Sequence, residues 1–167
     1  MKNEREFLYF GCVQVKKLVH NVKLRLATLN IGTLTSKGME IVDTLIRRRL
    51  NIACLQETKW VGSKAKELEN TGYKIYYTGL DRRRNGVGIV VDKDLKDNVV
   101  TVSRKGDRII LVKLVLGDII INIISVYALQ FRLDEHIKTQ FWESMDELMR
   151  EYLKESKFLL EETLMAM

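Results

Sequence analysis

The chain has 167 residues, of which 46% are hydrophobic and 30% charged, and its formal net charge is +6. This length and composition indicate one globular domain with a sizeable core and exclude a disordered chain. The basic balance suits an anionic partner such as nucleic acid but says nothing about fold. The apolar runs in the sequence are too short to span a membrane, and none resembles a signal peptide, so we expect an intracellular protein.

Residues 1–22 show no clean hydrophobic period and are interpreted as an amino-terminal extension. From residue 23 the pattern sharpens, and it predicts a strand over 24–29 that ends at Asn30, with a turn at Gly32. Ser36 is the expected cap of the next helix, whose last turn carries three arginines at 47–49. The apolar face of this helix is expected to hold Met39, Val42, Leu45 and Ile46.

A strand over 51–55 follows directly after the helix. A strand, a helix and a second strand form a parallel crossover, which brings the carboxyl ends of both strands to the same edge of the sheet. Asn30 and Glu57 should therefore lie side by side. Ligand sites in open α/β sheets form at such edges, so Glu57 is a candidate functional residue.

The middle of the chain predicts a short helix over Ser63–Asn70 and strands over 74–78 and 87–91. Gly86 and Gly88 flank Val87, which indicates close approach of the backbone at this point. A hairpin over 108–116 and 119–127 is apolar on both faces, so both sides of its sheet must be covered.

The last clear element is a long helix capped by Asp134, followed by a strand that begins at residue 157. Two helices cannot cover both faces of a sheet of about six apolar strands. We therefore expect either a partner or a second sheet on the remaining face, and we interpret the chain as the first half of a larger fold. The helix has an apolar stripe of Ile137, Phe141, Met145, Leu148 and Tyr152.

Cysteine and histidine give no sign of a metal centre. Cys12 and Cys54 are too few for a disulfide framework and too far apart for a zinc knuckle, and Cys54 lies in a strand pattern that indicates a buried, reduced thiol. His20 and His136 have no other ligand type at metal-binding spacing. We expect neither to bind a metal.

Four short segments carry a family resemblance when they are taken in order. They are residues 29–32 (LNIG), 54–59 (CLQETK), 85–89 (NGVGI) and 125–128 (SVYA). Together they resemble the endonuclease/exonuclease/phosphatase family, and within it the endonuclease domains of retrotransposons. The resemblance implies an α/β fold, with residues 23–160 forming the amino-terminal half of its two-sheet α/β sandwich and residues 161–167 a divergent tail.

The resemblance also implies roles for three residues. Asn30 matches an asparagine that orients the scissile phosphate and the metal ligand, and it is counted with Glu57 in the metal site. Glu57 matches the glutamate that binds Mg²⁺ (or Mn²⁺), and Tyr127 matches a tyrosine that contacts the phosphate in the transition state. The implied reaction is phosphodiester hydrolysis of DNA or another nucleic acid.

The residues themselves leave simpler alternatives open. Asn30 could cap a turn, Glu57 could be a surface acid paired with Lys59, and Tyr127 could belong to the core. The arginines at 47–49 are better explained as a solvated helix end than as a nucleic-acid patch.

The sequence also departs from the family pattern. Leu129 replaces a usual proline, Glu161 and Glu162 stand near the place of a Gly-Asp-x-Asn motif without matching its spacing, and a later Asp-His pair has no counterpart. We therefore expect a Mg²⁺-dependent endonuclease site that is inactive in this chain. The alternative is a non-catalytic module that binds nucleic acid or protein. Self-association through an uncovered sheet face and a nuclear location are further expectations.

Overall fold

The computed structural model describes residues 8–16, 21–130, 132–153 and 161–166. The first of its two sheets contains β1 (Leu8–Lys16), β2 (Asn21–Asn30), β3 (Ile52–Gln56), β4 (Gly62–Glu67), β5 (Lys74–Gly79) and β6 (Val87–Val91). The second contains β7 (Val99–Lys105), β8 (Ile109–Leu116), β9 (Ile119–Val126) and β10 (Glu161–Ala166). The helices are α1 (Gly38–Arg48), α2 (Glu135–Leu153) and the short 3₁₀ turn η1 (Lys96–Asn98).

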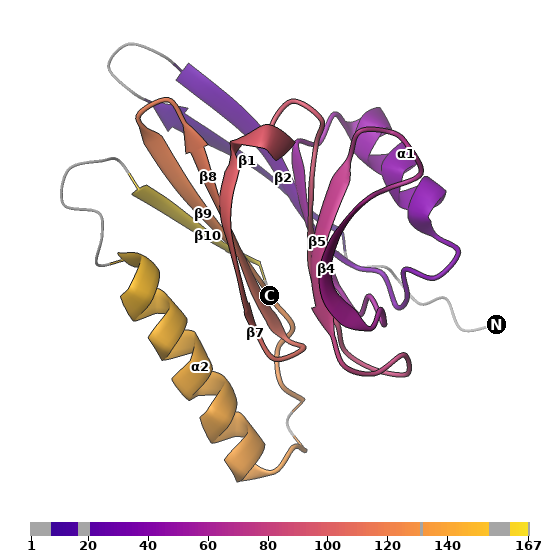
Figure 1. Cartoon of the computed structure of the whole chain (residues 1–167), viewed down its shortest axis with the longest axis vertical. Coiled ribbons are helices and arrows are strands. Elements are labelled where there is room, and N and C mark those ends of the chain that lie inside the picture. Colours follow the sequence, from indigo (N-terminus) through magenta and orange to yellow (C-terminus); the bar gives the residue numbers. More distant parts are fainter. Residues whose placement is uncertain (1–7, 17–20, 131, 154–160, 167) are drawn as a thin grey trace.

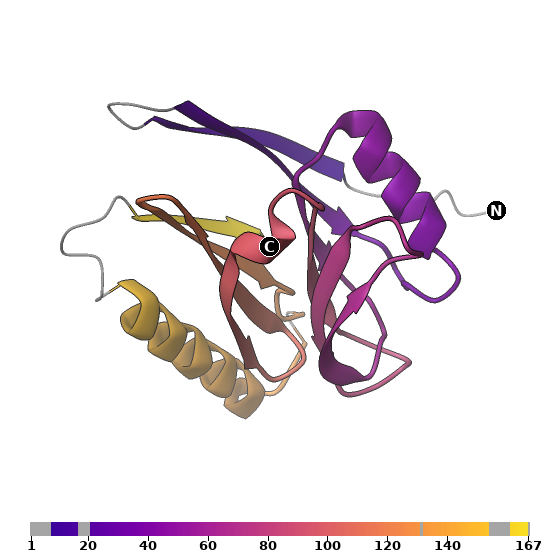
Figure 2. The ribbon, with the colours of Figure 1, turned by 45° about the horizontal axis from the view of Figure 1, so that its top comes forward.

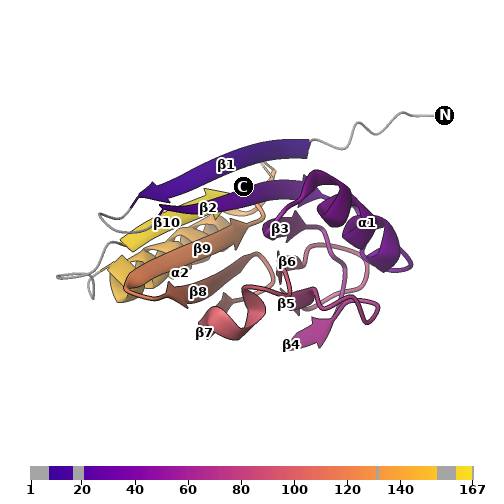
Figure 3. The ribbon, with the colours of Figure 1, turned by 90° about the horizontal axis from the view of Figure 1, so that it is seen from above.

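The two sheets pack face to face, with α1 on the outer side of the first and α2 on the outer side of the second (Figures 1 and 2). The strand order is β1-β2-β3-β6-β5-β4 in the first sheet and β10-β9-β8-β7 in the second. Figure 3 shows β1 and β4 at opposite edges of the first sheet. The predicted α/β fold is confirmed, and a second sheet covers the face that the sequence left open.

The predicted crossover is present, because β2 and β3 are parallel neighbours joined through α1. In their register Asn30 pairs with Gln56, so Asn30 and Glu57 both lie at the carboxyl edge of the first sheet. The hairpin of β8 and β9 is also confirmed, with Leu116 opposite Ile119 at the turn.

Among the residues that the structure describes, three apolar layers hold the fold together. The layer between the sheets is built by alternate side chains of facing strands, including Cys54, Ile89, Ile110, Val112 and Ile121. A second layer lies between the first sheet and α1, and a third lies between the second sheet and α2. Each fully buried Leu or Ile contributes roughly 1.5–3 kcal/mol. β8 confirms the need for cover on both sides, because Ile110 faces the other sheet while Ile109 and Leu111 lie beneath α2.

The start of α1 differs from the prediction. Lys37, and not Ser36, holds the N-cap position, and no side chain caps the helix there. Ser36 is in the left-handed region at φ +64°, within a loop that is anchored by Leu34, whose N–H bonds to the Thr58 carbonyl at 2.9 Å. Two members of the expected apolar face, Met39 and Ile46, are about half exposed, while Ile41, Val42 and Leu45 are buried.

The predicted helix at Ser63–Asn70 is wrong, since residues 62–67 form β4 and pair with β5 in an antiparallel register. Hydrogen bonds to β5 outweigh a weak helical spacing in this polar segment. β1, β7 and β10 were not predicted. β10 occupies most of the expected divergent tail, and the strand expected from residue 157 to 160 lies outside the described residues.

The cap and most of the stripe of α2 are confirmed. The Asp134 carboxylate accepts a hydrogen bond of 2.7 Å from the His136 N–H, and Phe141, Met145, Leu148 and Tyr152 are buried, whereas Ile137 is 42% exposed. Neither helix, within the residues the structure describes, has the length and apolar character needed to cross a membrane.

Candidate functional site

Glu57 stands at the point where β3 ends and the chain turns away from the sheet. Its φ of +57° is uncommon for a residue with a side chain and costs about 1–3 kcal/mol unless its surroundings enforce it. They do so here, because the next two N–H groups are both held by the loop before β6. Thr58 N donates to the Gly86 carbonyl at 3.1 Å and Lys59 N to the Asn85 carbonyl at 3.0 Å.

Gly86 allows this close approach between the two loops. A Cβ at Gly86 would lie 2.4 Å from the Thr58 hydroxyl, and its φ is +89°. The Gly86 N–H and the Asn85 amide both bond to Asp107, in the turn between β7 and β8, at 3.0 and 2.8 Å. The close backbone approach predicted at Gly86 is thus confirmed, and it ties the Glu57 loop to both sheets.

Asn30 lies directly beside Glu57, as the crossover predicted. Its amide nitrogen donates to Glu57 Oε1 at 3.0 Å, and its amide oxygen accepts a hydrogen bond from the Gly32 N–H at 3.2 Å. Asn30 therefore both caps the turn and orients the carboxylate, so the two interpretations of this residue are compatible.

Tyr127 reaches the same carboxylate from the other sheet. It follows the last residue of β9, and its hydroxyl donates to Glu57 Oε1 at 2.8 Å. Burial, the hydrogen bond to Glu57 and the charge of Glu57 together raise the pKa of Tyr127 to about 12, while Arg108 and Gln130 act in the opposite direction. The hydroxyl is accordingly protonated at neutral pH and remains a hydrogen-bond donor.

Arg108 holds Tyr127 in place and was not singled out from the sequence. The Tyr127 N–H donates to the Arg108 carbonyl at 2.8 Å, and the guanidinium lies 5.0 Å from the ring centroid. The guanidinium also donates to the carbonyls of Tyr127 and Ala128 at 3.4 and 3.1 Å. The sequence feature that could have identified Arg108 is its place as a charged residue immediately before the apolar strand β8.

Glu57 could supply one carboxylate to a hard cation at this edge. Glu57 Oε1 accepts both hydrogen bonds, which leaves Oε2 facing the Lys59 ammonium at 3.9 Å. Mg²⁺ needs only one or two protein carboxylates when water and phosphate complete its coordination. Within the described ranges, no group of three or more His, Cys, Asp or Glu side chains could hold a metal ion. The Asn30 amide oxygen accepts one hydrogen bond, from the Gly32 N–H, and its second lone pair could bind a cation.

The residues that depart from the family pattern are placed as follows. Leu129 is partly buried against the apolar cluster beneath α2. Glu161 and Glu162 pair with Ile120 and Ile121, at the opposite end of the strand from Tyr127 and about 20 Å away at 3.3 Å per residue. They cannot stand in for the missing motif at the site.

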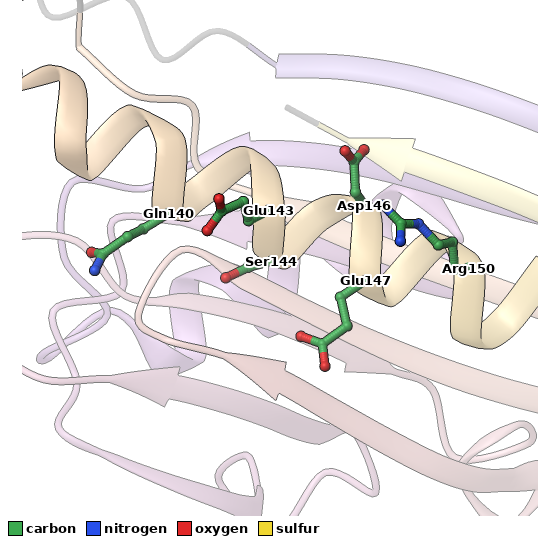
Figure 4. Close-up of a pocket in the computed structure, with 6 residues that line it drawn as sticks. All are labelled: Gln140, Glu143, Ser144, Asp146, Glu147 and Arg150. Carbon is green, nitrogen blue, oxygen red and sulfur yellow. The ribbon is translucent and has the colours of Figure 1, made fainter.

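Two further features take no part in the contacts of Glu57. Cys54 is buried and free, as expected, and burial raises its pKa to about 12. Figure 4 shows a hollow on α2, which takes no lining residue from the strand ends that carry Asn30, Glu57 and Tyr127. It is lined by Gln140, Glu143, Ser144, Asp146, Glu147 and Arg150.

The two stacked sheets, with their helices on the outer faces, give the chain the endonuclease/exonuclease/phosphatase fold. Its structure is similar to that of an AP endonuclease from Archaeoglobus fulgidus, with a TM-score of 0.55 and 23% identity over 77% of this chain and 52% of the other. The 3′-5′ exonuclease NExo from Neisseria meningitidis matches with a TM-score of 0.55 and 17% identity over the same shares. The endonuclease domain of TRAS1, a telomere-specific non-LTR retrotransposon, matches with a TM-score of 0.53 and 19% identity over 77% and 55%.

Among curated proteins, the sequence is similar to Craniofacial development protein 2. It is 28% identical to the Bos taurus protein over 126 residues, which are 74% of this chain and 21% of that protein. The Tragulus javanicus protein is 26% identical over 126 residues and 22% of its length. The chain thus spans about a fifth of these relatives. No family model matches the sequence.

Proposed function

We propose that the chain carries part of a Mg²⁺-dependent phosphodiesterase site for nucleic acid, with Glu57 as the cation ligand. The observation that supports this most is that Asn30 and Tyr127 both donate to Glu57 Oε1, which leaves Oε2 to bind a cation in competition with Lys59. The structurally similar proteins are an AP endonuclease, an exonuclease and a retrotransposon endonuclease, and a Neisseria NExo variant is bound to a product DNA hairpin. An origin from a retrotransposon endonuclease is part of the proposal.

The residues of the site supply binding and orientation. A divalent cation at Glu57 would neutralise negative charge on the phosphate and on the leaving oxygen. Tyr127 stays protonated and can turn its hydroxyl from Glu57 to a phosphate oxygen. Lys59, whose side chain is 29% exposed beside Glu57, adds positive charge where a phosphate would arrive.

The same proposal includes very low turnover for this chain. The sequence has no Gly-Asp-x-Asn motif and no Asp-His pair. The family resemblance implies that these groups align the attacking water and complete the metal and phosphate contacts. Losing one member of such a catalytic unit costs on the order of 10⁴–10⁶ in rate. We expect cation and nucleic-acid binding without appreciable hydrolysis.

A second candidate function is nucleic-acid binding without catalysis. The net charge of +6 supports it, as do the exposed Arg82, Arg83 and Arg84 just before Asn85, whose carbonyl holds the Lys59 N–H. Contacts of this type are sequence-independent and weaken steeply with salt. Self-association and a nuclear location stay predictions.

A plasmid-nicking assay with Mg²⁺ tests the catalytic part, with Glu57→Gln as the matched control. We expect no nicking above background for either protein. Mg²⁺-dependent nicking that Glu57→Gln abolishes would overturn the proposed inactivity while supporting the site.

A gel-shift series over salt concentration tests the binding part. We expect a shift that weakens as salt rises and that Mg²⁺ strengthens in the wild type more than in Glu57→Gln. A shift with the same response to Mg²⁺ in both proteins would favour the non-catalytic binding function.

A further inference from the structure

Glu57 and Tyr127 belong to different sheets, so their 2.8 Å contact depends on how the sheets are spaced. Stacked sheets lie about 10 Å apart, and apolar side chains between them attract one another without a strong directional preference. The central layer is apolar over most of its area. The bonds of Asn85 and Gly86 to Asp107 supply part of the directional contact at the end where the site lies.

A buried polar bridge lies there, one residue back from Glu57. Gln56 is 4% exposed and turns its side chain into the layer between the sheets. Its amide nitrogen donates to the Ser125 hydroxyl on β9 at 3.3 Å, and its amide oxygen accepts from the Thr28 hydroxyl on β2 at 3.2 Å. Both ends of the amide therefore have partners, one within its own sheet and one in the other.

Ser125 completes the bridge from the second sheet. Its side chain is fully buried, and its hydroxyl donates to the Leu55 carbonyl on β3 at 3.4 Å while accepting from Gln56. Two hydrogen bonds thus join β3 to β9. On β3 they involve Leu55 and Gln56, just before Glu57. On β9 they involve Ser125, two positions before Tyr127. Buried amides and hydroxyls lose free energy when unpaired, so the bridge favours one spacing of the sheets.

We propose that Gln56 and Ser125 are positioning residues of the site, and that their bridge between the sheets sets the distance between the Glu57 carboxylate and the Tyr127 hydroxyl. Neither side chain reaches the exposed face where substrate would bind. The inference extends the proposed function, because the positioned pair is the proposed cation site.

The variants are Gln56→Met, which keeps the length of the side chain without its hydrogen bonds, and Ser125→Ala. Ile123→Val, a buried apolar truncation on the same strand, is the matched control. Alkaline absorbance titrations with and without Tyr127→Phe isolate the ionisation of Tyr127 from that of the other tyrosines. Tb³⁺ luminescence excited through the aromatic residues measures cation binding at Glu57, and thermal melts follow folding.

We expect Gln56→Met and Ser125→Ala each to lower the pKa of Tyr127 and to weaken Tb³⁺ binding about tenfold or more. Ile123→Val should lose some stability and change neither value. The inference is overturned if both bridge variants keep the wild-type pKa of Tyr127. If Gln56→Met does not fold, the pKa of Tyr127 in Ser125→Ala alone tests the inference.

The two proposals can fail separately. If wild-type protein and Glu57→Gln bind Tb³⁺ equally, the proposed cation site is wrong. The titration of Tyr127 still decides whether the bridge positions the pair, because it requires no cation.

Discussion

The Tyr127 hydroxyl donates to Glu57 Oε1 at 2.8 Å, and this bond joins the carboxyl ends of β9 and β3 across two different sheets. Asn30 donates to the same oxygen from β2. The Glu57 carboxylate, at the end of β3, is therefore oriented by donors at the ends of β2 and β9. Its second oxygen, Oε2, lies 3.9 Å from the Lys59 ammonium.

Tyr127→Phe should change how stability depends on alkaline pH. The pKa of Tyr127 is raised from 10.0 to about 12 in the folded chain, so the native state holds its proton more tightly than the unfolded chain does. The resulting stabilisation is complete below pH 10 and is lost as pH rises towards 12. Denaturant unfolding at several pH values should show a steeper loss in wild type than in Tyr127→Phe. Parallel curves for the two proteins would contradict the altered environment of Tyr127.

Gly86→Ala should destabilise the loop that shapes Glu57. The added Cβ would meet the Thr58 hydroxyl at 2.4 Å and would also be held at positive φ. We expect a loss of more than about 2 kcal/mol by denaturant unfolding. Gly106→Ala is the matched control, because Gly106 also has positive φ but open space around it, and it should cost only about 1 kcal/mol. Equal costs would mean that contact with Thr58 is unimportant.

Lys59→Gln should strengthen binding of a divalent cation at low ionic strength. The ammonium lies 3.9 Å from Glu57 Oε2 and competes with a cation for it. A partly exposed ion pair at this distance is worth about 0–1 kcal/mol, so we expect an increase of up to about fivefold by titration calorimetry. Lys23→Gln removes the same charge near the other end of β2 and should have no effect. An equal gain in both variants would indicate a general effect of net charge.

Cys54 should be unreactive in the folded protein. It is buried, and burial raises the pKa of its thiol to about 12, so very little thiolate exists at pH 8. In a Cys12→Ser background, a thiol reagent should label Cys54 only after denaturant is added. Rapid labelling without denaturant would show that the central layer opens readily.

Much of the fold could be predicted because its signals are local. Apolar runs identified β3, β6, β8 and β9, and apolar spacing identified α2. β4 was missed because its residues are polar and exposed on an edge, where pairing with β5 determines the structure. The cap of α1 was missed because the loop before it is set by the distant contact from Leu34 to Thr58.

The candidate site also has one part that local sequence signals predict and another that depends on distant contacts. The crossover rule placed Asn30 beside Glu57 from the sequence alone, since both follow parallel strands of one sheet. Tyr127 was assigned only through the family resemblance, because no local pattern tells how two sheets stack. The bridge of Gln56 and Ser125 was not found for the same reason. Its members are 69 residues apart and meet only when the sheets pack.

Calorimetric titration of Mg²⁺ into wild-type protein and Glu57→Gln tests the central claim most directly. Wild-type protein keeps both carboxylate oxygens of Glu57. The amide in Glu57→Gln has nearly the same shape but no negative charge. We expect wild type to bind one Mg²⁺ weakly and Glu57→Gln to bind it at least about tenfold more weakly. Equal affinity in the two proteins, or no binding by wild type, would contradict a cation site at Glu57.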